Sequence, residues 1–239
     1  MNNKIIVVLP AYNAEKTLVK TVNDIDKKLV FKIILVDDGS NDQTAAVAKK
    51  LKLTYFRHHR NAGYGANQKT CYWEALKFDP DIVVMIHPDY QYPPKYLKYL
   101  VAPIVDGTAD LMLGTRIRSR AETLKNGMPL YKYIANRFLT LAENVILDLN
   151  LSEYHTGFRA FNKKVLTGLN LPKFSNDFIF DQQILIAAHT QNFRIGEVFT
   201  PCLYTKESSS INFRRSVIYG LEIIYNLFLY TVNKNWFRN

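Results

Sequence analysis

Short apolar runs alternate with segments of helical periodicity through the first half of the chain. The runs at residues 5–9, 33–36, 53–56 and 82–86 predict buried strands. Between them, apolar residues recur three or four positions apart, as at Leu18, Val22, Ile25 and Leu29, which predicts amphipathic helices. This alternation predicts an α/β fold with a Rossmann-like, mainly parallel sheet and helices on both faces.

Residues at the boundaries of these elements predict where they begin and end. Pro10 is expected to stop the first strand, because proline cannot donate to a strand ladder. Asn13, Asp42 and Asn67 are candidate caps for the helices that follow the strands. Pro94 is suited to open a further helix.

The second half continues with a strand at residues 111–113 and a long helix marked by Ile134, Phe138, Leu141, Val145 and Leu149. Residues 156–161 predict an edge or antiparallel strand, followed by a helix at 181–188 and a strand at 195–198. Residues 216–232 are nearly all apolar but too short for a comfortable membrane span. They predict either an interfacial helix or a terminal helix packed on the core, so residues 1–215 form the main domain and 216–239 a helical tail.

The polar segment after residues 82–86 is a candidate metal site. Asp89 and Gln91 offer two hard oxygens on the same side of an extended segment, and His87 could add a nitrogen. This donor set suits Mg²⁺ or Mn²⁺ bridging a diphosphate. A carboxylate at a strand end is also a common turn former or helix cap, and that alternative stays open.

The composition narrows the classes of partner. Lys and Arg number 31 against 21 Asp and Glu, a net charge of +10, so an acidic partner is expected. No compact nucleic-acid motif accompanies this charge, which favours phosphate chemistry at a membrane face over nucleic acid. Cys71 and Cys202 are expected to be buried thiols in a reducing cytoplasm, and the first apolar run is too short for a signal peptide.

The order of the motifs resembles that of family 2 glycosyltransferases with the GT-A fold, most closely the dolichyl- or polyprenyl-phosphate sugar transferases. The resemblance covers roughly residues 4–215. The motifs that carry it stand at residues 8–15, 36–44, 60–65, 87–89, 114–116 and 156–159.

The resemblance implies roles for residues at the strand ends. Pro10, Tyr12, Glu15, Asp37 and Asp38 would form the base and ribose pocket, with a tyrosine ring edge and one of the two aspartates as acceptor. Gly63 and Asn67 belong to a third donor-side loop. It also implies a metal site in which Asp89 and Gln91 match, while His87 replaces the expected first carboxylate. A metal-independent site, neutralised by arginines, is the alternative.

Several basic residues are candidates to bind phosphate, because arginine binds it bidentately and stays charged. Arg116 and Arg159 lie inside motifs and are expected to act on the leaving group. Arg118, Ser210, Arg214 and Arg215 are expected at the phosphates or the acceptor. For each arginine a solvated surface position is the competing interpretation.

Asp181 is the candidate general base, because aromatic residues flank it in the sequence. Asp177 is the second choice. The alternative is an exposed acid in the first turn of a helix for Asp181, and a helix cap for Asp177. We expect His58, His59, His155 and His189 to be structural or surface residues.

These observations predict an inverting glycosyltransferase that moves a sugar from a UDP- or GDP-sugar to a polyprenyl phosphate or another lipid-linked acceptor. It would work at the cytoplasmic face of the cell membrane, in peripheral contact through the C-terminal helix, in the assembly of cell-envelope polysaccharide. Transfer to a sugar hydroxyl with Asp181 as base, and a non-catalytic nucleotide-binding protein with a decayed metal site, are the alternatives.

Overall fold

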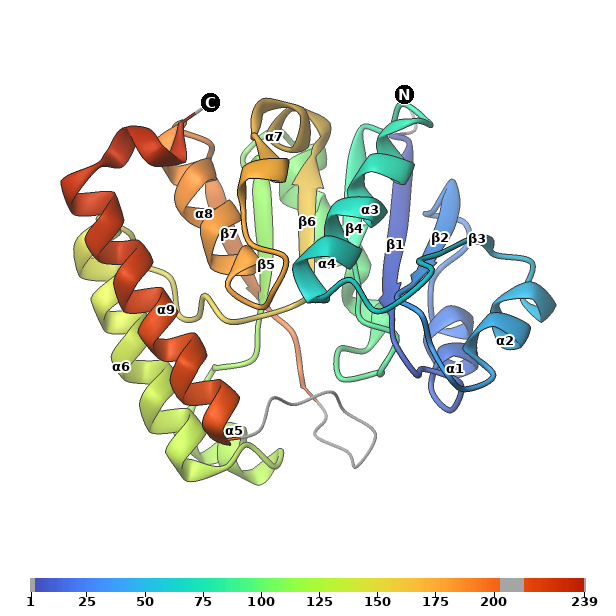
Figure 1. The fold of residues 1–239 in the computed structure, drawn as a ribbon, viewed down its shortest axis with the longest axis horizontal. Helices are drawn as coiled ribbons and strands as arrows, with labels where there is room; N and C mark the ends of the chain where they lie inside the picture. The colour runs from blue at the N-terminus through green and yellow to red at the C-terminus, as the bar shows by residue number, and fades with distance from the viewer. Residues whose placement is uncertain (1–2, 203–212, 239) are drawn as a thin grey trace.

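The computed structural model describes residues 3–202 and 213–238. A seven-stranded sheet runs through it in the order β3-β2-β1-β4-β6-β5-β7 (Figure 1). The strands are β1 Ile5–Ala11, β2 Lys32–Asp37, β3 Thr54–Arg57, β4 Ile82–Met85, β5 Leu111–Thr115, β6 Arg159–Asn162 and β7 Ile195–Phe199. All their pairings are parallel except those of β6, which is antiparallel to β4 and to β5. The predicted mainly parallel α/β sheet is confirmed. Of the two alternatives for β6, the antiparallel strand is confirmed and the edge strand is not, because β6 lies between β4 and β5.

Helices cover both faces of this sheet. They are α1 Leu18–Asn23, α2 Thr44–Lys50, α3 Tyr64–Leu76, α4 Leu97–Val105, α5 Arg120–Lys125, α6 Leu130–Leu147, α7 Lys163–Gly168, α8 Phe180–Thr190 and α9 Phe213–Val232, with 3₁₀ turns at Pro94–Tyr96, Leu171–Lys173 and Lys234–Phe237. Within the described residues, no helix is both long and apolar enough to cross a bilayer.

Alternation along β1 produces the two halves of the core. Ile6 and Val8 pack into the cluster formed with α3 and α8, while Ile5, Val7 and Leu9 pack into the cluster formed with α1 and α4. These residues are almost completely buried, as expected for a strand covered on both faces.

Three predictions about element ends were wrong. β1 continues through Pro10 to Ala11, because its ladder with β4 ends at the pair Val8–Met85 and Pro10 therefore needs no donor on that side. Asn13 does not cap α1 and instead adopts a left-handed conformation (φ 53°). Asn67 lies inside α3 and donates to the carbonyl of Ala11.

Two other boundary predictions are close to the observed ends. Asp42 stands one residue before Gln43, the N-cap of α2, and its carboxylate accepts a hydrogen bond from the backbone N–H of Thr44, the first residue of the helix. Pro94 opens a 3₁₀ turn that leads directly into α4.

The terminal helix α9 packs on the domain. Ile223, Leu227 and Tyr230 enter the same core cluster as α3 and α8, while the opposite side of the helix is exposed. Helix α6, beside α9 in Figure 1, exposes four of the five apolar residues that marked it in the sequence, Ile134, Phe138, Leu141 and Val145. The fifth, Leu149, lies beyond the end of α6 and packs against the core. The packed and the exposed sides of α9 thus fit both alternatives that the sequence left open.

A matched pair of leucines tests this assignment of core and surface. Leu113 in β5 is fully buried and Leu141 in α6 is 63% exposed. We expect Leu113→Ala to lower the free energy of unfolding by about 2–5 kcal/mol, and Leu141→Ala to change it by about 0.5 kcal/mol or less. Urea unfolding measures both. Equal losses would contradict the outward orientation of Leu141.

Candidate active site

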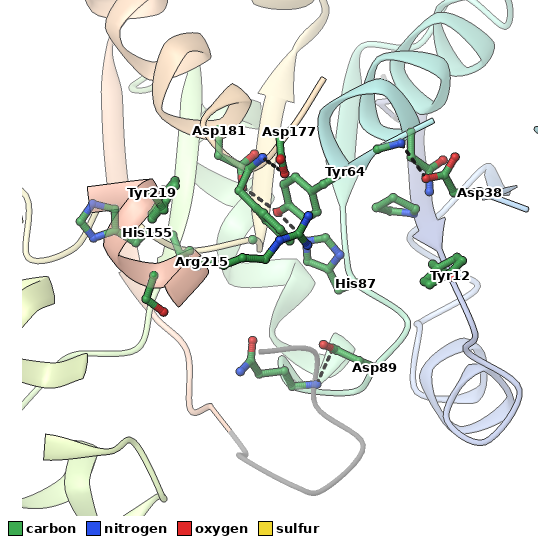
Figure 2. Close-up of a pocket in the computed structure, with 18 of the residues that line it drawn as sticks. Tyr12, Asp38, Tyr64, His87, Asp89, His155, Asp177, Asp181, Arg215 and Tyr219 are labelled. Atoms are coloured by element: carbon green, nitrogen blue, oxygen red, sulfur yellow. Dashed lines mark hydrogen bonds between the residues drawn. The ribbon is translucent and has the colours of Figure 1, made fainter. Parts of the chain in front are cut away.

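A cavity of about 1040 Å³ opens at the carboxyl ends of β1 and β4. It extends from the loops after β1 and β2 to the N-terminal halves of α6 and α9. Figure 2 shows Tyr12 and Asp38 at one end and His155 and Tyr219 at the other. Ligands bind at this edge in open α/β sheets, so the position agrees with the one predicted.

Five of the predicted nucleotide-binding residues line the same end of the cavity, namely Pro10, Tyr12, Asp38, Gly63 and Asn67. The Tyr12 ring is half exposed, as a stacking surface for a base must be. The Asp38 carboxylate accepts hydrogen bonds from the backbone N–H groups of Ala62 and Gly63, and one of its oxygens lies 2.6 Å from His58 Nδ1. Asp38 therefore fixes the 61–63 loop as well as facing the cavity, and His58 is structural, as predicted.

The structure does not bring Asp37 and Glu15 to the cavity wall. Asp37 is fully buried and accepts hydrogen bonds from the N–H of Ser40 and the hydroxyl of Tyr55. Glu15 accepts one from the N–H of Gln43. Both carboxylates hold the strand-end loops together, which is the turn role that competes with base binding.

The glycine at position 63 is required by its surroundings. Its φ is +106°, and a Cβ there would lie 2.5 Å from the carbonyl oxygen of Asn176. The N–H of Gly65 donates to the same carbonyl at 2.8 Å. The start of α3 is thereby fastened to the 174–176 loop, which carries the next part of the cavity wall.

Asp89 and Gln91 fit a hard divalent cation. Both line the cavity, both are 8% exposed, and the Asp89 carboxylate accepts the Gln91 backbone N–H at 2.9 Å. In the described part of the chain no group of three or more His, Cys, Asp and Glu could hold a metal alone. Phosphate oxygens would have to complete the coordination, as they commonly do for Mg²⁺.

His87 is turned away from that pair. Its ring stacks on Tyr64 with centroids 5.3 Å apart, and its Nε2 lies 3.0 Å from the Tyr64 hydroxyl. Burial lowers the pKa of His87, although the carboxylates of Asp89 and Asp181 oppose this effect. His87 is therefore neutral near pH 7 and belongs to the Tyr64 contact, apart from Asp89 in Figure 2.

Tyr64 connects His87 to the candidate base. Its hydroxyl donates to Asp181 at 2.7 Å, and Gln68 Nε2 donates to the other oxygen of that carboxylate at 3.0 Å. Burial, followed by the charge of Asp181, raises the pKa of Tyr64 well above its ordinary value, so the phenol keeps its proton. Since that proton goes to Asp181, His87 Nε2 must be the donor in the contact with Tyr64.

Arg159 does not reach the cavity. It is 1% exposed, and it donates to the backbone carbonyls of Thr156, Asp181 and Tyr154. Its guanidinium lies 3.9 Å from the Asp181 carboxylate. This geometry gives Arg159 a structural role behind Asp181, and the expectation that it contacts the leaving group does not fit.

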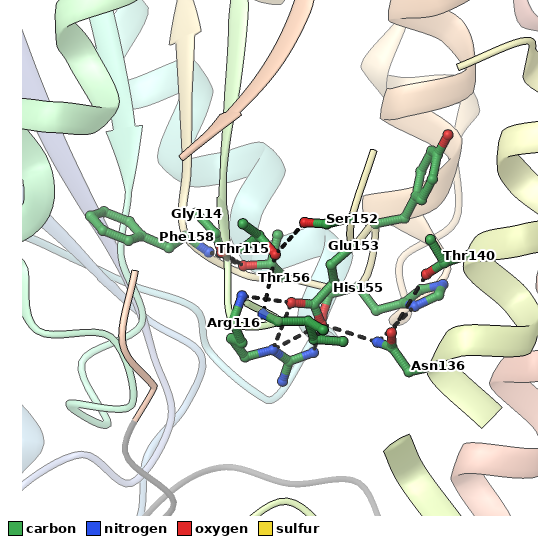
Figure 3. Close-up of polar contacts among 12 residues, drawn as sticks. Gly114, Thr115, Arg116, Asn136, Thr140, Ser152, Glu153, His155, Thr156 and Phe158 are labelled. Carbon is green, nitrogen blue, oxygen red and sulfur yellow. Dashed lines mark hydrogen bonds and ion pairs between the residues drawn. The ribbon is translucent and has the colours of Figure 1, made fainter. Parts of the chain in front are cut away.

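Arg116 lines the cavity but is held by a buried partner. Its guanidinium and its backbone N–H both bind Glu153, which is fully buried, and the guanidinium also donates to the carbonyl of His155 (Figure 3). Asn136 from α6 donates to the same carboxylate at 3.0 Å. The predicted phosphate contact of Arg116 would have to form from this anchored position.

Some of the remaining predicted residues line the cavity and others do not. Arg215 lines the cavity with its guanidinium 5.5 Å from the centre of the Phe178 ring, and Asp177 lines it as well. Arg118 is exposed, pairs with Glu122 and does not line the cavity, and exposed Arg214 does not line it either. Ser210 lies outside the described residues.

Several cavity residues were missed from the sequence. Tyr64, Lys132, Asn136 and Tyr219 all line it, and His155, which we expected to be structural or on the surface, does too. Lys132 and Asn136 lie four residues apart on α6, and this spacing places both on one side of the helix. That spacing is the signal for them in the sequence.

The mainly parallel sheet with a cavity at its strand ends has the fold of the GT-A glycosyltransferases. The family model "Glycosyl transferase family 2" matches residues 6–169, and the chain belongs to that family. It is a glycosyltransferase, and this membership argues against the alternative of a non-catalytic nucleotide-binding protein.

Two archaeal relatives span nearly the whole chain. An uncharacterized protein of Methanocaldococcus jannaschii is 31% identical over 231 residues, covering 95% of this chain and 92% of its own length. The UDP-N-acetylglucosamine–dolichyl-phosphate N-acetylglucosaminyltransferase of Methanococcus voltae is 29% identical over 252 aligned residues, covering 98% and 99%.

Among solved structures, glucosyl-3-phosphoglycerate synthase of Mycobacterium tuberculosis, in complex with phosphoglyceric acid, superposes with a TM-score of 0.72 at 21% identity, covering 95% of this chain and 79% of that one. A complex of that enzyme with Mn²⁺, UDP and phosphoglyceric acid gives a TM-score of 0.70 at 20% identity, covering 95% and 78%. These similarities show the fold.

The neutral His87 makes stability depend on pH. Because its pKa in the folded protein lies below the ordinary value of 6.5, the unfolded chain binds this proton more readily, and stability falls as the pH drops through that value. We expect His87→Gln to lose less free energy of unfolding than the wild type between about pH 7 and about pH 5.

Urea unfolding at a series of pH values measures this difference. Burial also lowers the pKa of His189, but that residue is present in both proteins and cancels in the comparison. Identical pH profiles for variant and wild type would show that His87 is not kept neutral by folding.

Proposed function

We propose that this enzyme transfers a sugar, with inversion, from a UDP-sugar to a polyprenyl phosphate. The observation that carries the proposal is the single cavity with two chemically different ends: a strand-end nucleotide site and a basic wall on α6 and α9. The Methanococcus voltae relative, which covers almost all of the chain, is named for a UDP-sugar donor and a dolichyl-phosphate acceptor.

The donor would occupy the end lined by Tyr12, Asp38 and Asn67. The tyrosine ring offers a stacking surface, and Gly63 lines the same end of the cavity. The diphosphate would then point along the cavity toward Asp89.

The acceptor phosphate would occupy the other end. Lys132 of α6 and Arg215 of α9 both line it, together with Arg116. Burial lowers the pKa of Lys132, and repulsion by the charge of Arg116 lowers it further. A phosphate monoester would relieve this repulsion between like charges, so the wall suits an anionic acceptor.

The reaction needs few proton transfers with such an acceptor. A phosphate oxygen attacks the anomeric carbon of the sugar while the bond from that carbon to the diphosphate oxygen breaks, and its electron pair leaves with UDP. The nucleophile is already ionised, so no general base is required. A divalent cation bound by Asp89 and Gln91 would supply positive charge for the leaving diphosphate.

Transfer to a sugar hydroxyl is the second candidate, because Asp181 lines the cavity and could accept the proton. Both of its oxygens already accept hydrogen bonds from Tyr64 and Gln68, so a hydroxyl would have to share an occupied carboxylate. This arrangement favours the phosphate acceptor. Asp181 and Tyr64 would then hold the cavity wall in place and would not transfer a proton.

A lipid acceptor also requires work at a membrane surface. We infer peripheral association with the cytoplasmic face of the membrane, with α9 as part of the contact. The exposed apolar side of that helix supports this inference.

Asp89→Ala tests the donor site. We expect the variant to remain folded, to lose transfer activity by about a hundredfold or more, and to lose Mn²⁺-dependent thermal stabilisation by UDP. Asp106→Ala is the control, because Asp106 is exposed at the end of α4, near the opposite ends of the strands. Turnover near the wild-type level in Asp89→Ala would remove the metal-site argument.

Lys132→Ala tests the acceptor end. Loss of a charge-assisted hydrogen bond to phosphate should raise the KM for polyprenyl phosphate by about tenfold to a hundredfold and leave the KM for the UDP-sugar unchanged. Steady-state kinetics with each substrate varied in turn measures both constants. Lys98→Ala, on the exposed side of α4, is the control. A change only in the KM for the UDP-sugar would indicate that Lys132 contacts the donor, and it would contradict the proposed acceptor end.

A further inference from the structure

Helix α6 has reversed amphipathicity. Its buried side carries Asn136, Thr140, Glu143 and Leu147, three of which are polar. Its exposed large side chains are all apolar, and they recur at helical spacing: Leu130, Tyr131, Ile134, Phe138, Leu141 and Val145. A surface helix ordinarily turns such a stripe toward the core. Here the core side is occupied by the polar contacts of Figure 3, so the stripe faces outward.

Helix α9 exposes a second apolar stripe. It consists of Phe213, Val217, Ile218, Leu221, Ile224, Tyr225, Phe228 and Val232. From residue 217 to residue 232, Thr231 is the one other exposed residue, and none of the exposed residues is charged. The same holds for α6 from residue 131 to residue 147, where Ala135 is the one other exposed residue.

The two stripes form one surface, which we call the α6–α9 face. The helices lie side by side (Figure 1), and the rings of Tyr131 and Phe213 meet edge to face with centroids 5.7 Å apart. Of the twenty large apolar side chains exposed in the described residues, fourteen belong to this face. The helices have 18 and 20 residues, so the face is about 27–30 Å long.

Basic residues border this face at both ends. Arg120 and Lys125 lie on α5, beside the N-terminal ends of α6 and α9, and Arg214 lies in the first turn of α9. Lys234 and Arg238 follow the C-terminal end of α9. All five are exposed. An apolar helical surface bordered by basic side chains is the pattern of helices that lie in the interface of an anionic bilayer.

We propose that the α6–α9 face lies flat on an anionic lipid bilayer. This inference rests on the proposed lipid acceptor, since the N-terminal halves of these two helices also line the cavity through Lys132 and Arg215. With the face in the bilayer, the polyprenyl tail of the acceptor would pass from the cavity into the membrane along apolar side chains that already lie in the hydrocarbon.

A lipid occupant fits the chemistry of the face better than a second copy of the chain. A protein interface forms about one hydrogen bond per 100–200 Å². The exposed residues of this face offer the hydroxyls of Tyr131, Tyr225 and Thr231 and no charged group. Hydrocarbon requires no such partners, and the basic border matches lipid phosphates.

The test is co-sedimentation of the full chain with vesicles of phosphatidylcholine and phosphatidylglycerol, compared with phosphatidylcholine alone. We expect binding to the anionic vesicles and about tenfold weaker binding to the neutral ones. The double variant Phe138→Glu, Leu221→Glu should lose vesicle binding by about tenfold or more. Phe31→Glu is the matched control, since Phe31 is 58% exposed elsewhere on the molecule and should leave binding unchanged.

Phe138→Ser with Leu221→Ser is a milder second pair, and thermal unfolding of both pairs verifies that they fold. Neither residue lines the cavity, so UDP-dependent thermal stabilisation should persist in both. If UDP did not stabilise the wild type, this would count against the proposed function and not against the proposed membrane contact of the α6–α9 face. Wild-type vesicle binding that the glutamate pair leaves intact, or a stable dimer that the glutamate pair converts to monomer without any vesicle binding, would overturn this proposal.

Discussion

A buried guanidinium holds together the chain segments that form the cavity. Arg159 stands in β6, the one antiparallel strand of the described sheet, and donates to carbonyls at Tyr154, Thr156 and Asp181. Without these hydrogen bonds the guanidinium would be an uncompensated charge in the core, which strongly destabilises a folded protein. The loop before β6 and the first turn of α8 are therefore fixed relative to each other, and with them the side chains of His155, Asp181 and Tyr64.

This constraint also explains why the polar side of α6 faces the protein interior. The loop fixed by Arg159 carries Glu153 and His155, whose polar groups must be satisfied where they are buried. Asn136 of α6 donates to Glu153 and also lies 3.2 Å from Nδ1 of His155. The helix that supplies these partners must turn its polar side inward, and its apolar side is then left at the surface. One arrangement thus supplies the end of the cavity lined by Lys132 and Asn136 and the apolar α6–α9 face.

The sequence was sufficient to predict the sheet, its mainly parallel direction and the position of the cavity, because apolar runs and strand-end motifs are local signals. It also indicated Tyr12, Asp38, Asp89 and Asp181, which line the cavity. It could not tell whether Asp37 or Asp38 faces the cavity, because the fold of the loop after the strand decides which of the two side chains is buried. Arg159 looked catalytic because its motif was recognised without its burial. The spacing of Lys132 and Asn136 marks a polar side of α6, but contacts with residues 153 and 155 decide that this side faces inward.

In the proposed reaction, one cavity brings a UDP-sugar to a lipid phosphate. Transfer of radiolabelled sugar from UDP-sugars to polyprenyl phosphate, offered together with free sugars and phosphoglycerate as competing acceptors, tests this. We expect label in the organic phase as a sugar phosphodiester, with the anomeric configuration opposite to that of the donor. Label found on a sugar hydroxyl or on phosphoglycerate, with polyprenyl phosphate unused, would contradict it.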